Sequence, residues 1–406
     1  MKISYLLNTF GKTGGHVVLY NFMDNLVRRG HDVVAVLPGG AVRWDENIRE
    51  RILRAESAPR KRRKKRFHGG LIERIRNIES VRQYRIFQKI KNLSRDLIRN
   101  WSPSDVTIST YSFTTYAGYC LAEKTVPLYH MQHFEEVFFH EDLLRQVARH
   151  TYHLPLIQMA NSTWLKTIMK KHFRSDAHLL NPGIDLDIFK PSVRPRDKYQ
   201  KDKKEWVIVS YMDESRLWKG FRDAATAVSF ARKQLAASGI RLVWKVFGLS
   251  APAQKYETEF AYMGQVFGRD LAALYSQADI VLVPSWYESF PLPPLEAMAS
   301  GSLVITTRYG TEDYVADGQN GLVVLPRNAE DMAERIISAV ERPADCLRMT
   351  DAGLETVKNY TWEKRTDVLE RILEDSQKGY SFTKFQLFDD LVKGDFKKYM
   401  YEEFLS

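Results

Sequence analysis

The sequence of 406 residues predicts an α/β protein with two parallel sheets covered by helices. Two observations indicate this class: apolar runs of strand length are each followed by a turn and a helical stretch, and the alternation starts again after residue 205. The first series comprises residues 3–7, 33–37, 106–111, 128–131 and 156–159. The second series comprises residues 206–211, 242–247, 280–283, 303–306 and 322–325.

The length of the chain also predicts more than one domain, because a single hydrophobic core rarely serves this many residues. Residues 187–205 contain Pro191, Pro195 and a cluster of lysines, a composition typical of an interdomain linker. We therefore expect a first domain over 1–190 and a second over 191–374. The aromatic-rich tail, from about 375 to 406, is expected to pack back on the first domain.

Composition indicates a cytoplasmic protein. No segment approaches the roughly 18 uninterrupted apolar residues that a membrane-spanning helix needs, and residues 1–8 are typical of a first strand rather than of a signal peptide. Cys120 and Cys346 are too few for a disulfide framework or a thiolate metal site.

The charge of the chain points to an anionic partner. A net charge of +10 suits nucleic acid, a membrane surface or a phosphorylated ligand, and the charge alone does not choose among them. The strongest bias is one basic run, Arg60, Lys61, Arg62, Arg63, Lys64, Lys65 and Arg66.

An anionic membrane surface is the partner that this basic run favours. Each basic residue near anionic lipid contributes about 1 kcal/mol, and apolar residues follow the run. A solvated loop is the alternative. Nucleic acid is not expected, because the aromatic residues that a single-strand binder interleaves with its cations are absent here.

The stretch from 278 to 321 carries the clearest chemistry. It contains a buried strand, a loop over 286–292, and a helix with prolines in its first turn and Gly301 at its C-terminal cap. In such sheets ligands gather beyond the carboxyl ends of strands, and a helix N-terminus offers N–H groups and a positive dipole end to a phosphate. The unit therefore predicts a diphosphate site.

Two carboxylates flank this predicted site. Glu288 precedes the helix and Glu296 lies within it, so they can accept hydroxyl protons from groups on either side of a diphosphate. One would face a sugar and the other a ribose. Taken alone, the pair is equally well read as a solvated loop residue and an acid favoured by the helix dipole.

The segment from Glu288 to Glu296 resembles the Glu-x7-Glu signature of glycosyltransferase family 4. Further segments along most of the chain resemble the same family, namely Gly14-Gly15, 29–33, Asn161-Ser162, 181–185, Lys219-Gly220, 274–279, 294–298 and 317–321. The resemblance implies a GT-B fold, in which two Rossmann-like domains with parallel sheets face a central cleft and the second domain holds the donor. It also implies that no metal or other cofactor is required and that the anomeric configuration is retained.

The resemblance also assigns roles around the donor. Glu296 would hold the ribose hydroxyls, Glu288 would be catalytic and contact the donor sugar, and Lys219 and Arg216 would supply positive charge. The diphosphate would be bound by the backbone of Ser289, Phe290, Pro291 and Leu292. The chain departs from the family where Ser289 and Pro291 replace glycines, and Pro291 has no N–H to donate. Arg216 also lies closer to Lys219 than in the family.

In the first domain the resemblance points to two loops. Gly14 and Gly15 follow the first strand and are similar to the family loop that faces donor phosphate and acceptor. His133 follows the strand at 128–131, and we choose it over His130 as the catalytic histidine, with the task of orienting the transferred sugar. Glu135 is its weaker neighbour. The donor phosphate itself is expected to take the acceptor proton.

These features predict a retaining glycosyltransferase. It would move a hexose-type sugar from a UDP- or GDP-sugar to a lipid-linked or cell-surface glycan acceptor, at the inner face of the membrane, in cell-envelope polysaccharide biosynthesis. Two alternatives remain: a nucleotide-sugar epimerase or phosphorylase of GT-B fold, and a non-catalytic subunit that recruits a membrane or partner. The sequence does not decide the base, the sugar or the acceptor.

Overall fold

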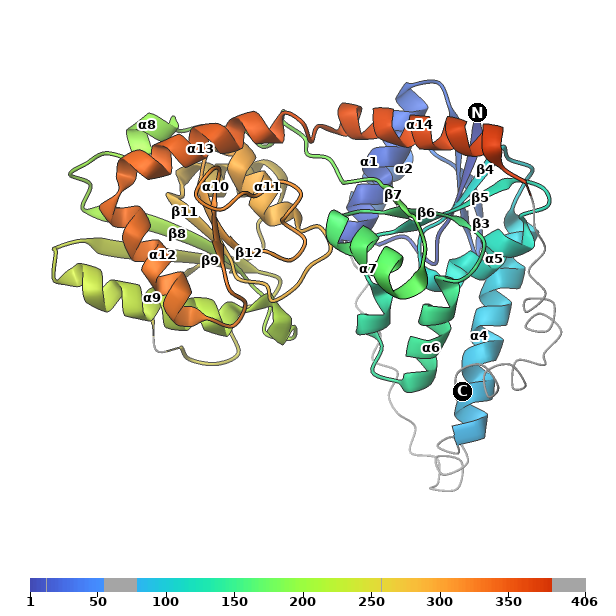
Figure 1. The fold of residues 1–406 in the computed structure, drawn as a ribbon, viewed down its shortest axis with the longest axis horizontal. Helices are drawn as coiled ribbons and strands as arrows, with labels where there is room; N and C mark the ends of the chain where they lie inside the picture. The colour runs from blue at the N-terminus through green and yellow to red at the C-terminus, as the bar shows by residue number, and fades with distance from the viewer. Residues whose placement is uncertain (12, 55–78, 257, 382–406) are drawn as a thin grey trace. The chain divides into compact units, whose positions relative to one another are not determined.

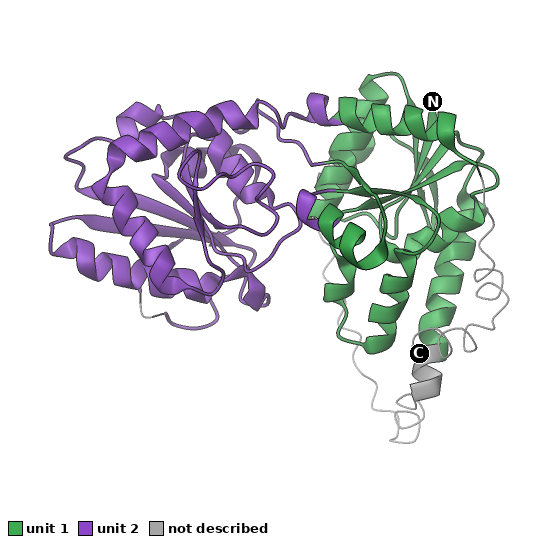
Figure 2. Ribbon diagram, in the orientation of Figure 1, with its two compact units in different colours: residues 1–160, 166–180, 366–406 green, residues 161–165, 181–365 purple. Residues whose placement is uncertain are grey.

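The computed structural model describes residues 1–11, 13–54, 79–256 and 258–381 (Figure 1). The basic run from Arg60 to Arg66 and most of the predicted tail lie outside the described residues. The chain forms two compact units (Figure 2). Unit 1 comprises 1–160, 166–180 and 366–406, and unit 2 comprises 161–165 and 181–365. These limits differ from the predicted 1–190 and 191–374.

Unit 1 contains a seven-stranded sheet in the order β3-β2-β1-β4-β5-β6-β7. Its strands are β1 Lys2–Leu6, β2 Asp32–Leu37, β3 Gly40–Arg43, β4 Val106–Ser109, β5 Val126–Met131, β6 Ile157–Ala160 and β7 His178–Leu179. Every neighbouring pair is parallel except β2 with β3. The strands predicted from buried apolar runs are present. The half-exposed edge strand β3 and the two-residue strand β7 were not predicted.

Helices surround this sheet. They are α1 Gly14–Arg28, α2 Glu46–Arg54, α4 Glu79–Asn100, α5 Thr115–Cys120, α6 Asp142–Thr151 and α7 Thr163–Phe173, with short 3-10 helices η1 Ser112–Thr114 and η2 Glu135–Phe138. Helix α1 buries Leu19, Phe22 and Leu26. It is followed by Gly30, whose φ of 86° lies in the left-handed region that favours glycine.

The last described helix, α14 (Trp362–Gly379), begins in unit 2 and continues in unit 1. Within unit 1, Arg29 donates to Asp367 at 2.7 Å and to Glu370 at 2.5 Å. His31 Nε2 lies 2.8 Å from Glu370. These contacts fasten the returning chain to unit 1.

Unit 2 contains a six-stranded parallel sheet in the order β10-β9-β8-β11-β12-β13. Its strands are β8 Glu205–Met212, β9 Arg241–Gly248, β10 Ala261–Tyr262, β11 Ile280–Val283, β12 Leu303–Thr307 and β13 Leu322–Val324. The chain builds outward from β8 to β10 and then crosses back to place β11 on the other side of β8. Open α/β sheets bind ligands where the strand order reverses in this way.

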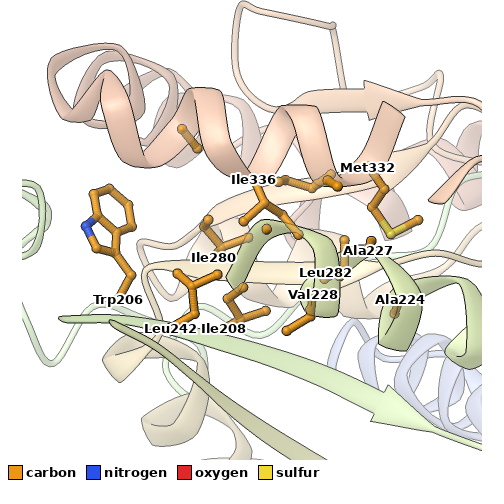
Figure 3. Packing of buried hydrophobic residues seen from close by; sticks show 14 of the residues in the cluster. Trp206, Ile208, Ala224, Ala227, Val228, Leu242, Ile280, Leu282, Met332 and Ile336 are labelled. Atoms are coloured by element: carbon orange, nitrogen blue, oxygen red, sulfur yellow. The ribbon is translucent and has the colours of Figure 1, made fainter. Parts of the chain in front are cut away.

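The helices of unit 2 fix the strand ends by packing on the sheet. They are α8 Pro195–Lys198, η3 Leu217–Lys219, α9 Phe221–Ala236, α10 Gly268–Gln277, α11 Leu292–Ala299, α12 Ala329–Glu341 and α13 Pro343–Val357. In Figure 3, small residues of α9 and larger ones of α12 meet apolar residues of the strands, among them Ile208, Leu242, Ile280 and Leu282. The core thus holds β8 and β11 at the centre of the unit.

The predicted linker packs into unit 2. The Lys198 ammonium is buried, where it donates to the carbonyl of Ala278 at 2.8 Å and to Ser302 Oγ at 3.1 Å. Burial lowers the pKa of Lys198 to about 7. The lysine-rich composition at 198–204 therefore marks the edge of a folded unit. Within the part of the chain that the structure describes, no helix is both long and apolar enough to cross a bilayer.

Candidate active site

The predicted donor residues lie at the carboxyl edge of the unit 2 sheet, where the strand order reverses. Lys219 ends η3, which follows β8, and Glu288 lies in the loop that follows β11. Glu296 lies on α11, directly after that loop. Because β8 and β11 are paired neighbours, the structure brings these residues to one place.

Lys219 and Glu288 form an ion pair, in which Lys219 Nζ donates to Glu288 Oε1. Their side chains are only 22% and 14% exposed, so water screens the pair weakly. The predicted phosphate-binding cation therefore contacts the predicted sugar-binding carboxylate directly. A phosphate entering the site would compete with Glu288 for the same ammonium.

Gly220 allows the segment after β8 to approach the loop after β11 closely. It has a φ of +69° directly after η3, and a Cβ at this position would lie 2.1 Å from the carbonyl oxygen of Pro284. Only glycine fits this approach. The neighbouring Trp286 N–H donates to the Trp218 carbonyl at 2.7 Å, so the chain on either side of the ion pair is joined through its backbone as well.

Aromatic residues directly precede both members of the ion pair in the chain, and no role was predicted for them from the sequence. The rings of Trp218 and Tyr287 stack with centroids 6.2 Å apart and planes 12° apart. Trp286 Nε1 donates to Asp223 Oδ2 at 2.6 Å, and the Arg327 guanidinium lies 3.9 Å from the centre of the same indole. Trp286 and Tyr287 precede Glu288 directly and could have been noticed, whereas no local signal marks Arg327.

Glu296 is partly buried, and its carboxyl group makes no hydrogen bond or ion pair within the described part of the chain, although its backbone carbonyl accepts from Ser300. Burial raises its pKa to about 7. The carboxyl group thus changes its protonation near neutral pH, and its charge also helps to raise the pKa of the buried Tyr275. A carboxyl group in this state can exchange hydrogen bonds with ligand hydroxyls.

The N-terminus of α11 offers fewer donors than we predicted for a phosphate site. Pro291 is its N-cap, and Pro293 and Pro294 fill the first turn. Proline has no N–H, so Leu292 supplies the one amide among the first residues of this helix. A diphosphate here would depend more on side-chain charge, and Lys219 is well placed to provide it.

The turn between the two glutamates points its side chains inward. Ser289 is buried and its hydroxyl donates to Asn161 Oδ1. Phe290 packs on the Tyr314 ring at 5.0 Å, and the Pro291 carbonyl accepts from the Tyr314 hydroxyl at 2.5 Å. The serine that replaces a glycine therefore has a structural partner. The side chains of Ser289 and Phe290 are thus used for packing, and the role of the turn toward a diphosphate stays a prediction.

Arg216 is placed less favourably than Lys219. Its side chain is 51% exposed, and its Nε lies 3.5 Å from Asp213 Oδ2. It takes no direct part in the pair between Lys219 and Glu288. Its predicted donor-binding role rests on position in the sequence rather than on a contact in the folded unit.

In unit 1 the two predicted loops meet each other. Gly14 and Gly15 begin α1, and a Cβ on Gly15 would come 3.3 Å from the Gln132 side chain in the loop after β5. His133, in the same loop, is half-buried, and its Nδ1 lies 3.2 Å from the Phe134 carbonyl. When Nδ1 carries the ring proton and donates it in this contact, Nε2 has no proton and is the nitrogen that accepts hydrogen bonds.

His130 and Glu135 occupy different environments from His133. His130 is buried with its ring edge-on to Phe22 at 5.6 Å, and burial lowers its pKa to about 4. This makes it a core residue. The buried Glu135 carboxylate accepts from the Ser112 N–H at 2.7 Å and from the Tyr129 hydroxyl at 3.1 Å, and burial raises its pKa to about 7. It anchors η2.

A family model matches the part of the chain that contains these candidate residues. Residues 205–342, which include Lys219, Glu288 and Glu296, match the family model described as glycosyl transferases group 1. The chain is 33% identical over 216 residues to a D-inositol 3-phosphate glycosyltransferase of Corynebacterium glutamicum, covering 49% of this chain and 51% of that protein. It is 32% identical over 231 residues to an MMP alpha-(1->4)-mannosyltransferase of Mycolicibacterium hassiacum, covering 55% and 54%. The chain thus spans about half the length of these relatives.

Solved structures confirm the predicted fold class. Sucrose-phosphate synthase from Thermosynechococcus elongatus superposes with a TM-score of 0.70 at 17% identity, covering 93% of this chain and all of that one (100%). Anabaena HepE in complex with UDP-glucose superposes with a TM-score of 0.62 at 15% identity, covering 92% and 100%. Both units therefore form a GT-B fold.

Proposed function

We propose that this chain is a retaining glycosyltransferase that moves a hexose-type sugar from a nucleotide diphosphate sugar to a hydroxyl group of a glycan acceptor. The observation that carries the proposal is the ion pair of Lys219 with Glu288 beside Glu296, at the reversal of strand order in unit 2. Cation and carboxylates of this kind suit the diphosphate and the hydroxyl groups of such a donor.

Each residue takes one part of the donor. Lys219 transfers its hydrogen bond from Glu288 to the diphosphate, and this frees the Glu288 carboxylate to accept from hydroxyls of the sugar. Glu296 accepts from the ribose hydroxyls. The backbone from Ser289 to Leu292 lies along the phosphates, and Arg216 adds charge at the edge of the site.

In the reaction, the bond between the anomeric carbon and the phosphate oxygen breaks, and its electron pair stays on that oxygen. The acceptor hydroxyl oxygen forms the new bond to the anomeric carbon on the same face, and its proton passes to the departing phosphate. Lys219 stabilises the negative charge that develops there. His133, Gly14 and Gly15 keep their predicted roles toward the sugar, the donor phosphate and the acceptor.

The named relatives guide the choice of substrates. HepE is described in complex with UDP-glucose, and two curated relatives are named as a glycosyltransferase and a mannosyltransferase. We therefore propose a UDP- or GDP-hexose as donor. We further propose a lipid-linked or cell-surface glycan as acceptor, metal-independent transfer, and a cytoplasmic protein held at the inner membrane face by the basic run 60–66.

Product analysis tests this function. The full chain is incubated with UDP- and GDP-hexoses, with and without sugar acceptors, and the products are separated and weighed by mass spectrometry. Transfer yields nucleoside diphosphate and glycosylated acceptor in equal amounts. Conversion of the donor to an isomer without acceptor, or release of sugar 1-phosphate on adding phosphate, would instead indicate an epimerase or a phosphorylase. Absence of any turnover with bound donor would indicate a non-catalytic subunit.

A further inference from the structure

We propose that the exposed aromatic surface of η2 in unit 1 binds the ring face of an acceptor pyranose. This η2 surface consists of Val137 and Phe138, with Phe113, Phe139 and His133 beside them. The inference rests on the proposed glycosyltransferase function and specifies its acceptor: a neutral sugar ring is contacted here, rather than a lipid chain.

Phe138 is the centre of the η2 surface. Its side chain is 47% exposed and that of Val137 is 41% exposed, although both are large apolar groups. The Phe138 ring lies with its centroid 4.5 Å from that of the His133 imidazole. Phe113 and Phe139 stack at 5.3 Å nearby and extend the aromatic surface. The surface therefore directly adjoins the histidine predicted to orient the transferred sugar.

Buried hydrogen bonds hold η2, the segment that carries Phe138, in place. The Glu135 N–H donates to the Tyr152 hydroxyl at 2.8 Å, and its carboxylate accepts from Ser112 and Tyr129. These partners come from α6, β5 and η1 or lie directly beside them. A platform already held in place loses little conformational freedom when it binds a ligand.

Polar groups lie at the edge of the same surface. Glu136 directly precedes Val137, and its Oε1 lies 3.6 Å from Arg149, a distance too long for a direct hydrogen bond. Within the described part of the chain, Glu136 Oε2 is buried and has no hydrogen-bond partner, so Oε1 is the carboxylate oxygen that lies toward Arg149. The Arg149 side chain is 46% exposed and that of Glu136 is 19% exposed, and sugar hydroxyls both donate and accept, so one of them can contact Glu136 Oε1 and the Arg149 guanidinium. An apolar ring face beside a polar edge matches a pyranose.

The charge of the segment argues against a membrane as its occupant. Residues 134–151 contain the acids Glu135, Glu136, Glu141 and Asp142, whereas Arg145 and Arg149 are their arginines and they contain no lysine. Anionic lipid attracts basic segments and would be repelled by this one. A neutral sugar is not repelled, so the charge pattern favours the acceptor ring.

Three variants of the full chain test the inference by acceptor kinetics. They are Phe138→Ala, Phe138→Tyr, and Phe230→Ala as a matched control, since Phe230 is equally exposed at 47% but lies on α9 of unit 2. With methyl pyranosides as acceptors, Phe138→Ala should raise the acceptor KM about tenfold. The donor KM should stay unchanged, because Lys219, Glu288 and Glu296 lie in unit 2. Phe138→Tyr and Phe230→Ala should behave as the wild type.

Binding measured by saturation-transfer NMR with the same methyl pyranosides provides a readout independent of turnover. The wild type should show saturation transfer to the sugar ring protons, and Phe138→Ala should lose it while keeping the wild-type melting temperature. Equal signals in both proteins, or none in the wild type, would overturn the inference. So would a kinetic loss confined to lipid-linked acceptors. If the wild type binds the glycosides but transfers no sugar from any donor, the proposed function fails instead.

Discussion

Lys219 and Glu288 pair across two loops that follow the neighbouring strands β8 and β11, and both side chains are largely shielded from water. The pair joins the group that suits a phosphate to the group that suits a sugar hydroxyl. In the free protein each charge satisfies the other, which avoids an unpaired charge in a shielded place. Donor binding must therefore replace this contact, and substitutions at the two positions should have different effects.

Replacing Lys219 by alanine should weaken binding of UDP or GDP, because a hydrogen bond to a charged group is worth about 1.5–3 kcal/mol, or roughly 10- to 100-fold in affinity. Isothermal titration calorimetry with the nucleoside diphosphates measures this. Arg216→Ala should cost less, since Arg216 is half exposed and turned to Asp213. Lys233 is exposed on α9, and the control variant Lys233→Ala should bind the nucleoside diphosphates as tightly as the wild type. A larger loss for Arg216 than for Lys219 would reverse the assignment.

Gly220→Ala should destabilise the protein, because the new Cβ would overlap the Pro284 carbonyl oxygen. Gly239 provides the control: its φ of +67° is similar, yet nothing lies within 4 Å of an added Cβ. Gly239→Ala should therefore lower the free energy of unfolding only by the strain of an alanine in the left-handed region, about 1–2 kcal/mol. Thermal or urea unfolding should show a distinctly larger loss for Gly220→Ala. Equal losses would mean that the two loops adjust without cost.

Glu296 should make stability depend on pH. Its pKa is raised from 4.5 to about 7, so between these values the native protein keeps a proton that the unfolded chain has released. Stability therefore falls as pH rises through this window, and the loss is complete above the folded pKa. Glu296→Gln stays neutral and escapes the loss. The melting temperature of Glu296→Gln minus that of the wild type should be larger at pH 8 than at pH 5. The same difference at both pH values would contradict this.

Transfer should survive removal of divalent metal ions. We expect Lys219 to supply the positive charge that the departing diphosphate needs, as the resemblance to a metal-independent family implies. Turnover measured after dialysis against EDTA should match that of the untreated protein. Loss of turnover that Mg²⁺ or Mn²⁺ restores would show that a metal ion, rather than Lys219, carries this role.

Much of the fold follows from local patterns. Every strand predicted from an apolar run is present, because a strand buried on both faces must be apolar along its length. The edge strands β3, β7 and β10 escaped prediction since they are short or half exposed. The unit limits also differed, because they depend on distant contacts such as that of Arg29 with Glu370.

The grouping of the candidate site residues in the fold was predicted in part. Spacing and resemblance located Lys219, Glu288 and Glu296, and the fold brings all of them to the carboxyl edge of one sheet. The ion pair and the contact of Arg327 with Trp286 join residues far apart in the chain, so no local pattern could reveal them. The catalytic role of His133 stays a prediction.

Sugar transfer by Glu288→Gln is the most direct measurement of whether this site performs the reaction. Glutamine keeps the shape of the side chain but removes the charge, and loss of such an electrostatic contact typically costs about 10²–10³ in turnover. The exposed Glu334 on α12 serves as control, because Glu334→Gln should transfer as the wild type. We expect Glu288→Gln to keep its fold and its UDP or GDP binding while transfer falls by about this factor. Full transfer by Glu288→Gln would contradict the assignment of the active site.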